Sequence, residues 1–502
     1  MGAKSRQWIE RQLPTFEAAL QPLFTSLPSQ QGQLSQHVAM YALHRVFVDE
    51  RGWFVNSLEE SSLYSPATLA SLTSILQNQI PSRVDQEFQA CFQDGVAPKE
   101  LAVLAATLDS LVHQEVLERA MAVFKLKKLP LFGRVSIDQM DQVMEQVMMS
   151  YILEEGGSAS AMEAYISGNL SIAERYPNWS ELQRFLRNIE GVVLPAKSTH
   201  LKFEDLTAVI HELQTHFGRW QDGECQEQMR ELHKMDQECP GHVNLRDFYA
   251  ANLYKGKWQF SETADYLRAL GALEESQPDS PRVILANYVQ GPNNCVSSSR
   301  YYSQCCLNPC SSHLAKLEQA VGGPEVSPEV LQSTIAMVLP RPQASPTQLW
   351  DRLRKIAPEG KVALHGSSFA EWLHRAYPRD CPAPVLHAPK QERPREYTAR
   401  TGDPTDVPEA EMRSFVEESP GHVGQCDLKW GVSADNSWDK LESETRYTGR
   451  RLLNVLPTTE TFFTFFTWPW ASFAALFSTV LLFALYPRRG KEPVCDLLVT
   501  SY

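Results

Sequence analysis

Residues 461–487 read TFFTFFTWPWASFAALFSTVLLFALYP and contain no charged side chain. A helix that crosses the hydrocarbon core of a bilayer needs about 20 apolar residues. Trp468 and Trp470 lie near one end of this stretch and Tyr486 lies at the other, as aromatic residues do at membrane interfaces. The sequence therefore predicts one transmembrane helix over 461–487, followed by a short tail over 488–502.

The first residues of the chain, MGAKSRQWIERQLPTF, contain no apolar run of signal-peptide length. The stretch 461–487 would then be the first hydrophobic segment to leave the ribosome. This predicts a tail-anchored, single-pass membrane protein whose N-terminal region is cytosolic. The cations beside the stretch do not set its orientation, because three lie on each side. They are Arg446, Arg450 and Arg451 before it, and Arg488, Arg489 and Lys491 after it.

The charge balance bears on the partners of the chain. It has 47 basic and 60 acidic residues, which is a formal net charge of −13. Nucleic acids are bound by basic surfaces, so the acid excess predicts no nucleic-acid partner. The expected partner is the membrane, through 461–487, and a protein partner stays open.

Four of the ten cysteines lie close together, in NCVSSSRYYSQCCLNPC. They are Cys295, Cys305, Cys306 and Cys310. A structural zinc site usually takes two closely spaced cysteine pairs, and only one such pair is present. We expect these residues to be thiols, with disulfides in an oxidising compartment and a metal site as the alternatives. The glycosylation sequons at Asn169 and Asn178 matter only if this region is lumenal.

A short pattern recurs at 32–34, 133–135, 241–243 and 360–362. Each copy reads glycine, any residue and an aliphatic residue, and an amphipathic run follows. In a calcium-binding EF-hand loop, position 6 is a glycine, and a helix leaves after a short strand. In paired EF-hands the aliphatic at position 8 meets its counterpart in the partner loop. The pattern predicts paired helix–loop–helix units that have mostly lost their ligands, and a generic helical domain with glycine turns is the alternative.

The third copy, over 236–248, resembles the EF-hand family most closely. With Gly241 at position 6, the candidate calcium ligands at positions 1, 3, 7, 9 and 12 are Asp236, Glu238, the carbonyl of His242, Asn244 and Asp247. Pro240 at position 5 brings no side-chain oxygen, and an aspartate stands at position 12 in place of the longer glutamate. We therefore expect weak calcium binding, with a dissociation constant of roughly 10⁻⁴ M or weaker. The sequence spacing suggests Leu201 as the aliphatic partner of Val243, and Val96 as that of Val135.

Four longer segments carry a further resemblance. They read GHVNLRDFYA, GKWQFSETADYLRALGALEES, NYVQGPNNCVSSSRYYSQCCLNPC and GKVALHGSSFAEWLHRAYPRDCP, and lie between residues 241 and 382. Together they are similar to a poorly characterised family of large proteins from dinoflagellates and related protists. The resemblance implies a membrane-attached, EF-hand-like protein with a C-terminal transmembrane helix, and it implies no established activity.

The sequence contains no motif typical of catalysis. A phosphate-binding loop, a dinucleotide-binding glycine motif and a G-x-S-x-G elbow do not occur. His211 and His216 in HELQTH are five residues apart and so do not share the helix face that a zinc site needs. His365 stands just before Ser367, but no orienting acid is evident, and we expect a turn that opens a helix. These observations predict a protein that is not an enzyme.

The expected fold is mainly α. It combines degenerate EF-hand-like helix–loop–helix units with a small cysteine-containing α(+β) region and one C-terminal transmembrane helix. The expected divisions are a helical domain over 1–155, an EF-hand-like domain over 156–275, a cysteine-containing helical domain over 276–388, a flexible linker over 389–455, the membrane helix and the tail.

The expected function is that of a membrane-anchored, non-enzymatic adaptor, either calcium-responsive or purely structural. The alternative places the region 282–383 in a lumenal or extracellular domain that disulfides stabilise and that could be enzymatic.

Overall fold

A computed structural model gives the structure of the chain. It describes residues 3–56, 58, 95–153, 176, 178–194, 199–236, 239–254, 259–277, 280–297, 299–343, 346–384 and 391–419. The chain divides into one unit of residues 1–425 with 501–502, and a second unit of 426–500. All described residues belong to the first unit. The predicted membrane helix and tail lie outside the described residues, and no helix within them is long and apolar enough to cross a membrane.

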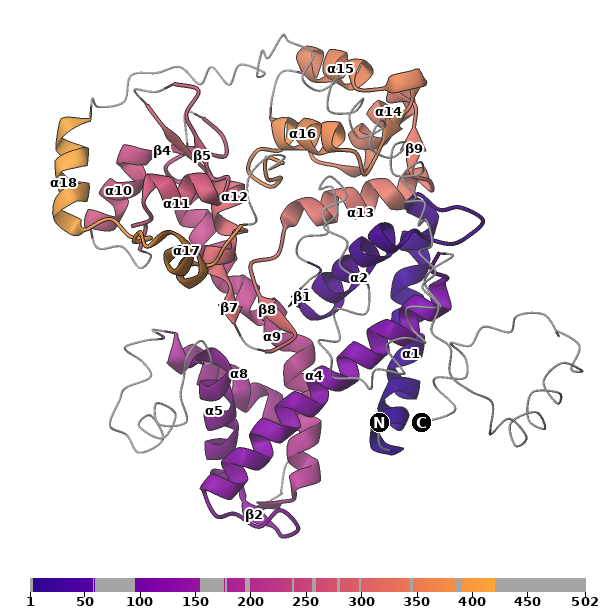
Figure 1. Ribbon diagram of the computed structural model, residues 1–502, viewed down its shortest axis with the longest axis vertical. Coiled ribbons are helices and arrows are strands. Elements are labelled where there is room, and N and C mark those ends of the chain that lie inside the picture. The colour runs from indigo at the N-terminus through magenta and orange to yellow at the C-terminus, as the bar shows by residue number, and fades with distance from the viewer. Residues whose placement is uncertain are drawn as a thin grey trace, which may run out of the picture. The chain divides into compact units, whose positions relative to one another are not determined.

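The described residues are mainly helical, as predicted, and short strands lie between the helices (Figure 1). The first helices are α1 (Ala3–Ser26), α2 (Gln36–Arg51), α4 (Pro98–Leu126), α5 (Ile137–Leu153), α8 (Trp179–Val193), α9 (Phe203–His233), α10 (Leu245–Leu253) and α11 (Ala264–Ala269). The later helices are α12 (Leu285–Val289), α13 (Pro309–Val321), α14 (Pro328–Val338), α15 (Pro346–Lys355), α16 (Ser367–Ala376), α17 (Pro394–Thr401) and α18 (Glu409–Glu418).

The strands are two or three residues long. They are β1 (Phe54–Val55), β2 (Val135–Ser136), β3 (His200–Leu201), β4 (His242–Asn244), β5 (Leu273–Glu274), β6 (Arg282–Ile284), β7 (Val296–Ser297), β8 (Tyr302–Gln304), β9 (Glu325–Val326) and β10 (Val362–Ala363). All of their pairings are antiparallel, in the orders β4-β6-β5, β1-β8-β7, β2-β3 and β9-β10. Strands this short do not form a core of their own, so they serve to join helix–loop–helix units.

Each of the four glycine-x-aliphatic copies lies at one of these junctions. The aliphatic residue of each copy is paired in antiparallel register with a second aliphatic residue. The pairs are Leu34 with Val96, Val135 with Leu201, Val243 with Val283, and Val362 with Val326. All eight side chains are buried. We refer to the four helix–loop–helix assemblies around these bridges as pairs one to four, in chain order.

Two of the predicted partners were wrong. Val243 pairs with Val283, which follows it in the chain, and not with Leu201. Leu201 pairs instead with Val135, and Val96 pairs with Leu34. Spacing alone could not choose the partner of Val243, because Leu201 lies 42 positions before it and Val283 lies 40 positions after it. As a consequence, the predicted domain boundary at 155/156 separates the two bridged loops of pair two. The boundary at 275/276 likewise separates the two bridged loops of pair three.

Local sequence signals start several of the helices. The hydroxyls of Ser35, Thr263 and Ser327 accept hydrogen bonds from N–H groups of the first turns of α2, α11 and α14. Proline stands at the start of α4, α13 and α14, where its missing N–H is not needed.

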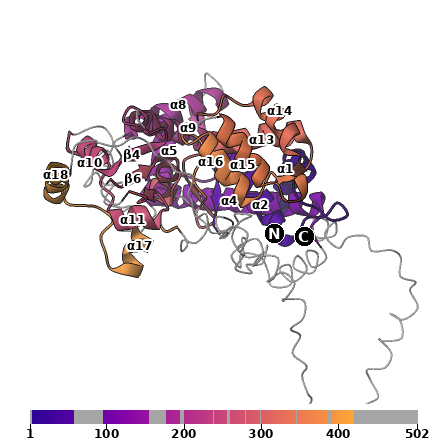
Figure 2. The same cartoon turned by 90° about the horizontal axis from the view of Figure 1, so that it is seen from above.

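The predicted linker contains ordered structure. Within it, α17 and α18 are helical, and Tyr397 and Met412 are buried in the same core as Phe248 and Tyr288 of pair three. Figure 1 and Figure 2 both show α18 beside α10. The prediction of a flexible linker was therefore wrong for 391–419. The many prolines and charged residues suggested a flexible segment, but it contains two short amphipathic helices, with Tyr397 buried in α17 and Met412 buried in α18.

Candidate functional site

The loop that resembles an EF-hand joins α9 to α10. Gly241 has a φ of +77°, which favours glycine, and a Cβ at this position would lie 2.3 Å from the carbonyl oxygen of Pro378. Asn244 ends the loop, and its side-chain oxygen accepts a hydrogen bond of 2.9 Å from the N–H of Arg246 in the first turn of α10. The loop thus turns at position 6, where the sequence placed the glycine, and Asn244 at position 9 caps the exit helix.

Asp236, at position 1, is the most strongly bonded residue of the loop. Its side chain is completely buried. Arg379 donates to both carboxylate oxygens, from Nε to Oδ2 at 2.8 Å and from Nη2 to Oδ1 at 2.7 Å. The N–H of Gly241 donates to Oδ2 at 2.8 Å, and Nδ1 of His233 lies 3.2 Å from it. The carboxylate therefore has a full set of partners from the protein itself.

The electrostatics of Asp236 follow from these contacts. Burial raises its pKa, but the hydrogen bonds from His233, Arg379 and the Gly241 N–H outweigh burial and lower the pKa to about 2. A two-pronged guanidinium contact is among the stronger charge-assisted arrangements in proteins. At neutral pH the loop thus holds a carboxylate neutralised by an arginine, where an EF-hand would hold one neutralised by calcium.

Two of the other predicted ligands, Asn244 and Asp247, have side-chain partners of their own. The amide nitrogen of Asn244 donates to Ser280 Oγ at 2.7 Å, and Asp247 forms an ion pair of 3.2 Å with Arg246. The His242 ring is buried and lies 3.5 Å from a carboxylate oxygen of Glu274. Glu238 lies outside the described residues. Within the described ranges, no group of three or more histidine, cysteine, aspartate or glutamate side chains is arranged to hold a metal ion. Calcium binding here stays a prediction.

The segment 378–383 was not identified from the sequence as part of this site. Besides the contacts of Arg379, it places Asp380 3.0 Å from Nε2 of His313, and it places Cys381 in a disulfide with Cys310. The backbone of Ala383 forms two hydrogen bonds, of 2.7 and 2.9 Å, with the side chain of Asn287. One short segment thereby joins pair three to pair four. Only the density of charge and cysteine in PRDC could have drawn attention to it.

The four clustered cysteines form disulfides, which corrects the expectation that they are free thiols. The bonds are Cys225–Cys306, Cys295–Cys305 and Cys310–Cys381, and Cys239 is disulfide-bonded as well. Two of the three bonds span 81 and 71 residues of sequence. Two of the clustered cysteines therefore have partners far away in the chain. The local spacing that was weighed for zinc could not reveal them.

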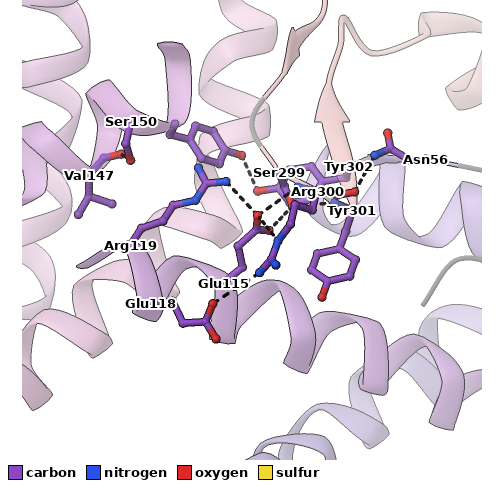
Figure 3. A network of polar contacts seen from close by, with 11 residues as sticks. Asn56, Glu115, Glu118, Arg119, Val147, Ser150, Ser299, Arg300, Tyr301 and Tyr302 are labelled. Atoms are coloured by element: carbon purple, nitrogen blue, oxygen red, sulfur yellow. Dashed lines mark hydrogen bonds and ion pairs between the residues drawn. The ribbon is translucent and has the colours of Figure 1, made fainter. Parts of the chain in front are cut away.

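A second polar cluster surrounds Glu115 of α4 (Figure 3). Its buried carboxylate accepts hydrogen bonds from Arg119 at 2.9 Å and from the backbone N–H of Arg300 at 3.1 Å, and it also accepts one from Ser299. The hydroxyls of Tyr151 and Tyr302 are hydrogen-bonded beside it. The cluster ties the β7–β8 hairpin to α4 and α5. Its carboxylate has several partners already, so we assign the cluster a structural role.

A cavity of about 470 Å³ lies beside the Cys225–Cys306 bond. Val48, Met229 and Val289 contribute to its apolar lining. Its buried acid, Asp222, accepts hydrogen bonds from the N–H of Leu307 at 2.8 Å and from Gln226 at 2.7 Å. The acid therefore acts as a backbone anchor for the segment that precedes α13.

The motifs that came close to catalytic patterns have structural surroundings. His211 packs edge-on against Trp8, and His216 lies 2.7 Å from Glu212 in the preceding turn of its own helix. His365 is buried beside Glu318, and α16 begins two residues later at Ser367. The predicted helix-opening turn is confirmed.

The chain matches no family model, no curated protein and no solved structure in the comparisons.

Proposed function

We propose that this chain is a non-enzymatic scaffold built from EF-hand-like pairs, in which an arginine has replaced calcium. The observation that carries the proposal is the two-pronged contact of Arg379 with the buried carboxylate of Asp236. A calcium sensor changes shape because its cation comes and goes. Here the cation is part of the chain, so the loop is held in one state. We therefore favour the purely structural adaptor over the calcium-responsive one.

The EF-hand-like description is supported by three features of pair three. Gly241 has the left-handed backbone expected at position 6, Asn244 caps the exit helix, and Val243 meets Val283 across the short strands. The similar bridges of the other pairs extend the description to the whole described region. The resemblance to the dinoflagellate and protist family agrees with this proposal.

We further propose that residues 461–487 anchor the scaffold in a membrane and that residues 1–425 lie on its oxidising side. The support comes from the disulfides, since such bonds persist in secretory and extracellular compartments and are rare in the cytosol. This reverses the orientation expected from the sequence and takes up the alternative of a lumenal or extracellular domain. No catalytic arrangement among the described residues favours an enzymatic role for it.

Calcium titration of the full-length protein in detergent tests the scaffold. We expect no binding heat and an unchanged unfolding temperature between excess calcium and excess chelator. The variant Arg379→Met provides the comparison, because it removes the cation and leaves Asp236 able to take up another. A calcium-dependent rise in the unfolding temperature of the wild-type protein would contradict the proposal.

Protease protection in sealed membranes tests the orientation. We expect residues 1–425 to be protected when the cytosolic face is exposed to protease. A glycosidase shift would report on Asn169, whereas the amide of Asn178 already donates a hydrogen bond to Glu224. Digestion of residues 1–425 from the cytosolic face would contradict this orientation and support the tail-anchored prediction, in which these residues are cytosolic.

A further inference from the structure

The end of α4 forms a projecting tip, which we define as residues 121–134. The helix ends at Leu126, and Lys128 takes a left-handed φ of 56°. The N–H of Leu129 donates back to the carbonyl of Phe124 at 2.9 Å. This cap reverses the chain, so the residues LPLF at 129–132 extend past the helix before β2 begins (Figure 1).

Large apolar side chains are exposed on this tip. Phe132 has a relative exposure of 105%, and the values for Leu126, Met121 and Leu131 are 48%, 39% and 38%. Single exposed apolar residues are normal, but a group of them usually marks an interaction site. Met121, Leu129, Leu131 and Phe132 also line an open groove of about 700 Å³. The tip thus offers both a protruding aromatic ring and a shallow apolar groove.

Cations surround these apolar groups. Lys125 and Lys128 line the groove, and Lys127 and Arg134 lie beside it in the sequence. Residues 121–134 themselves contain no acid. The acids nearby are Glu118, which lies 3.5 Å from Arg300, Asp138 in the first turn of α5, and Glu204 and Asp205 in the first turn of α9. In a chain with a net charge of −13, this is a local excess of positive charge. The tip is therefore complementary to a surface that is both negatively charged and apolar.

We propose that the tip docks onto a lipid bilayer that contains anionic lipids. Phe132 and Leu131 enter the boundary between head groups and acyl chains, and the lysines behind them contact lipid phosphates. This layering suits lysine side chains, whose apolar stems pack among apolar groups while the ammonium stays at the polar surface. Anionic lipids are most abundant in the cytosolic leaflet, so a tip on the oxidising side requires a membrane whose other leaflet also contains them.

Photo-crosslinking tests the docking with the full-length chain. The photoreactive residue p-benzoylphenylalanine is placed at position 132, and the protein is reconstituted into vesicles of phosphatidylcholine alone or of phosphatidylcholine with phosphatidylserine. We expect lipid adducts mainly with the anionic vesicles, with a yield that falls as salt is added. Because each cation near an anionic surface adds to binding, the double variant Lys125→Glu/Lys128→Glu should lower the yield by on the order of tenfold or more.

Two matched controls separate docking from general effects. The double variant Lys316→Glu/Lys355→Glu changes the net charge equally at other exposed positions, and it should leave the yield unchanged. Met337 on α14 is 82% exposed, and the photoreactive residue in its place should give few lipid adducts. Circular dichroism checks that each variant is folded, and the salt titration provides the same readout without substitution. Equal yields from neutral and anionic vesicles would overturn the proposal, and so would adducts that join two protein chains.

Discussion

At the residue scale, Asp236 and Arg379 carry most of the functional argument. A buried carboxylate is costly unless charge and hydrogen bonds compensate for its desolvation. Here a guanidinium, a backbone N–H and a histidine surround it, and none of them leaves when conditions change. The sequence indicated that Asp236 was a site residue, but not that its partner would be 143 positions away.

Replacing only Arg379 should lower the free energy of unfolding more than replacing both Asp236 and Arg379. Arg379→Met leaves a buried charge without its main partner, and we expect the free energy of unfolding to fall by about 2–4 kcal/mol. The double variant Asp236→Asn/Arg379→Met should recover part of this loss. Urea unfolding of the two variants measures the difference. Equal losses in both would show that the ion pair is not what holds the loop.

The pH dependence of this pair has a definite sign. The pKa of Asp236 is about 2 in the folded protein, below its usual value of 3.8. Its stabilising contribution is therefore complete above pH 4 and disappears as the pH falls through 2, and it amounts to about 2 kcal/mol. Acid unfolding of Asp236→Asn should show a correspondingly weaker pH dependence in this range.

The contribution of Glu262 to stability depends on pH with the opposite sign. Burial raises its pKa from 4.5 to about 7, even though the hydroxyl of Tyr288 donates to it at 2.9 Å. The folded state binds the proton more tightly, so stability falls as the pH rises from 4.5 to 7. The stabilising effect of Glu262→Gln relative to wild type should grow by about 2–3 kcal/mol between pH 4.5 and 8. Urea unfolding at both pH values measures it, with exposed Glu329→Gln as the control. A constant difference would mean that Glu262 is ionised throughout.

At the scale of elements, the short strands matter more than their length suggests. Each bridge buries two aliphatic side chains where two loops meet, and so it sets which helix–loop–helix units belong together. The long helices α4 and α9 then continue from one pair to the next. The elements themselves were largely predictable from helical periodicity. The partners were not, because every loop carries an equivalent aliphatic residue.

The packing of α17 and α18 against pair three makes a prediction at this scale. Met412 is 3% exposed and packs in the core that includes Phe248 and Tyr249. We expect Met412→Ala to lower stability by about 2–3 kcal/mol. It should also raise hydrogen exchange selectively in 394–418. The exposed position Arg413 on the same helix offers Arg413→Ala as a control. Unchanged exchange in α18 would indicate that this helix does not depend on its docking.

At the scale of the whole molecule, long-range covalent and ionic contacts join the pairs. Cys225–Cys306 and Cys310–Cys381 connect distant segments, and the buried carboxylate of Glu318 receives Arg45 at 2.9 and 3.2 Å. These contacts fix pairs to one another in a way that suits a scaffold. A switch would need some of them to be released.

The disulfides predict a clear response to reduction. Cross-links that close loops of 71 and 81 residues each stabilise by about 4 kcal/mol in the chain-entropy model. We expect reductant to lower the unfolding temperature and to slow migration in denaturing gels. When the unreduced protein is alkylated, mass spectrometry should find Cys239 and the six cysteines of the three bonds unmodified. Full alkylation of protein from its native membrane would argue against an oxidising compartment.

The sequence by itself determined the helical character, the four turn sites and the apolar stretch 461–487, because these depend on local periodicity, glycine backbone freedom and composition. The tertiary structure alone decided which loops pair, which cysteines bond and what neutralises Asp236. Those outcomes depend on contacts between residues tens to hundreds of positions apart. No local pattern around Asp236 or Cys225 specifies Arg379 or Cys306, since the folded chain brings those partners into place.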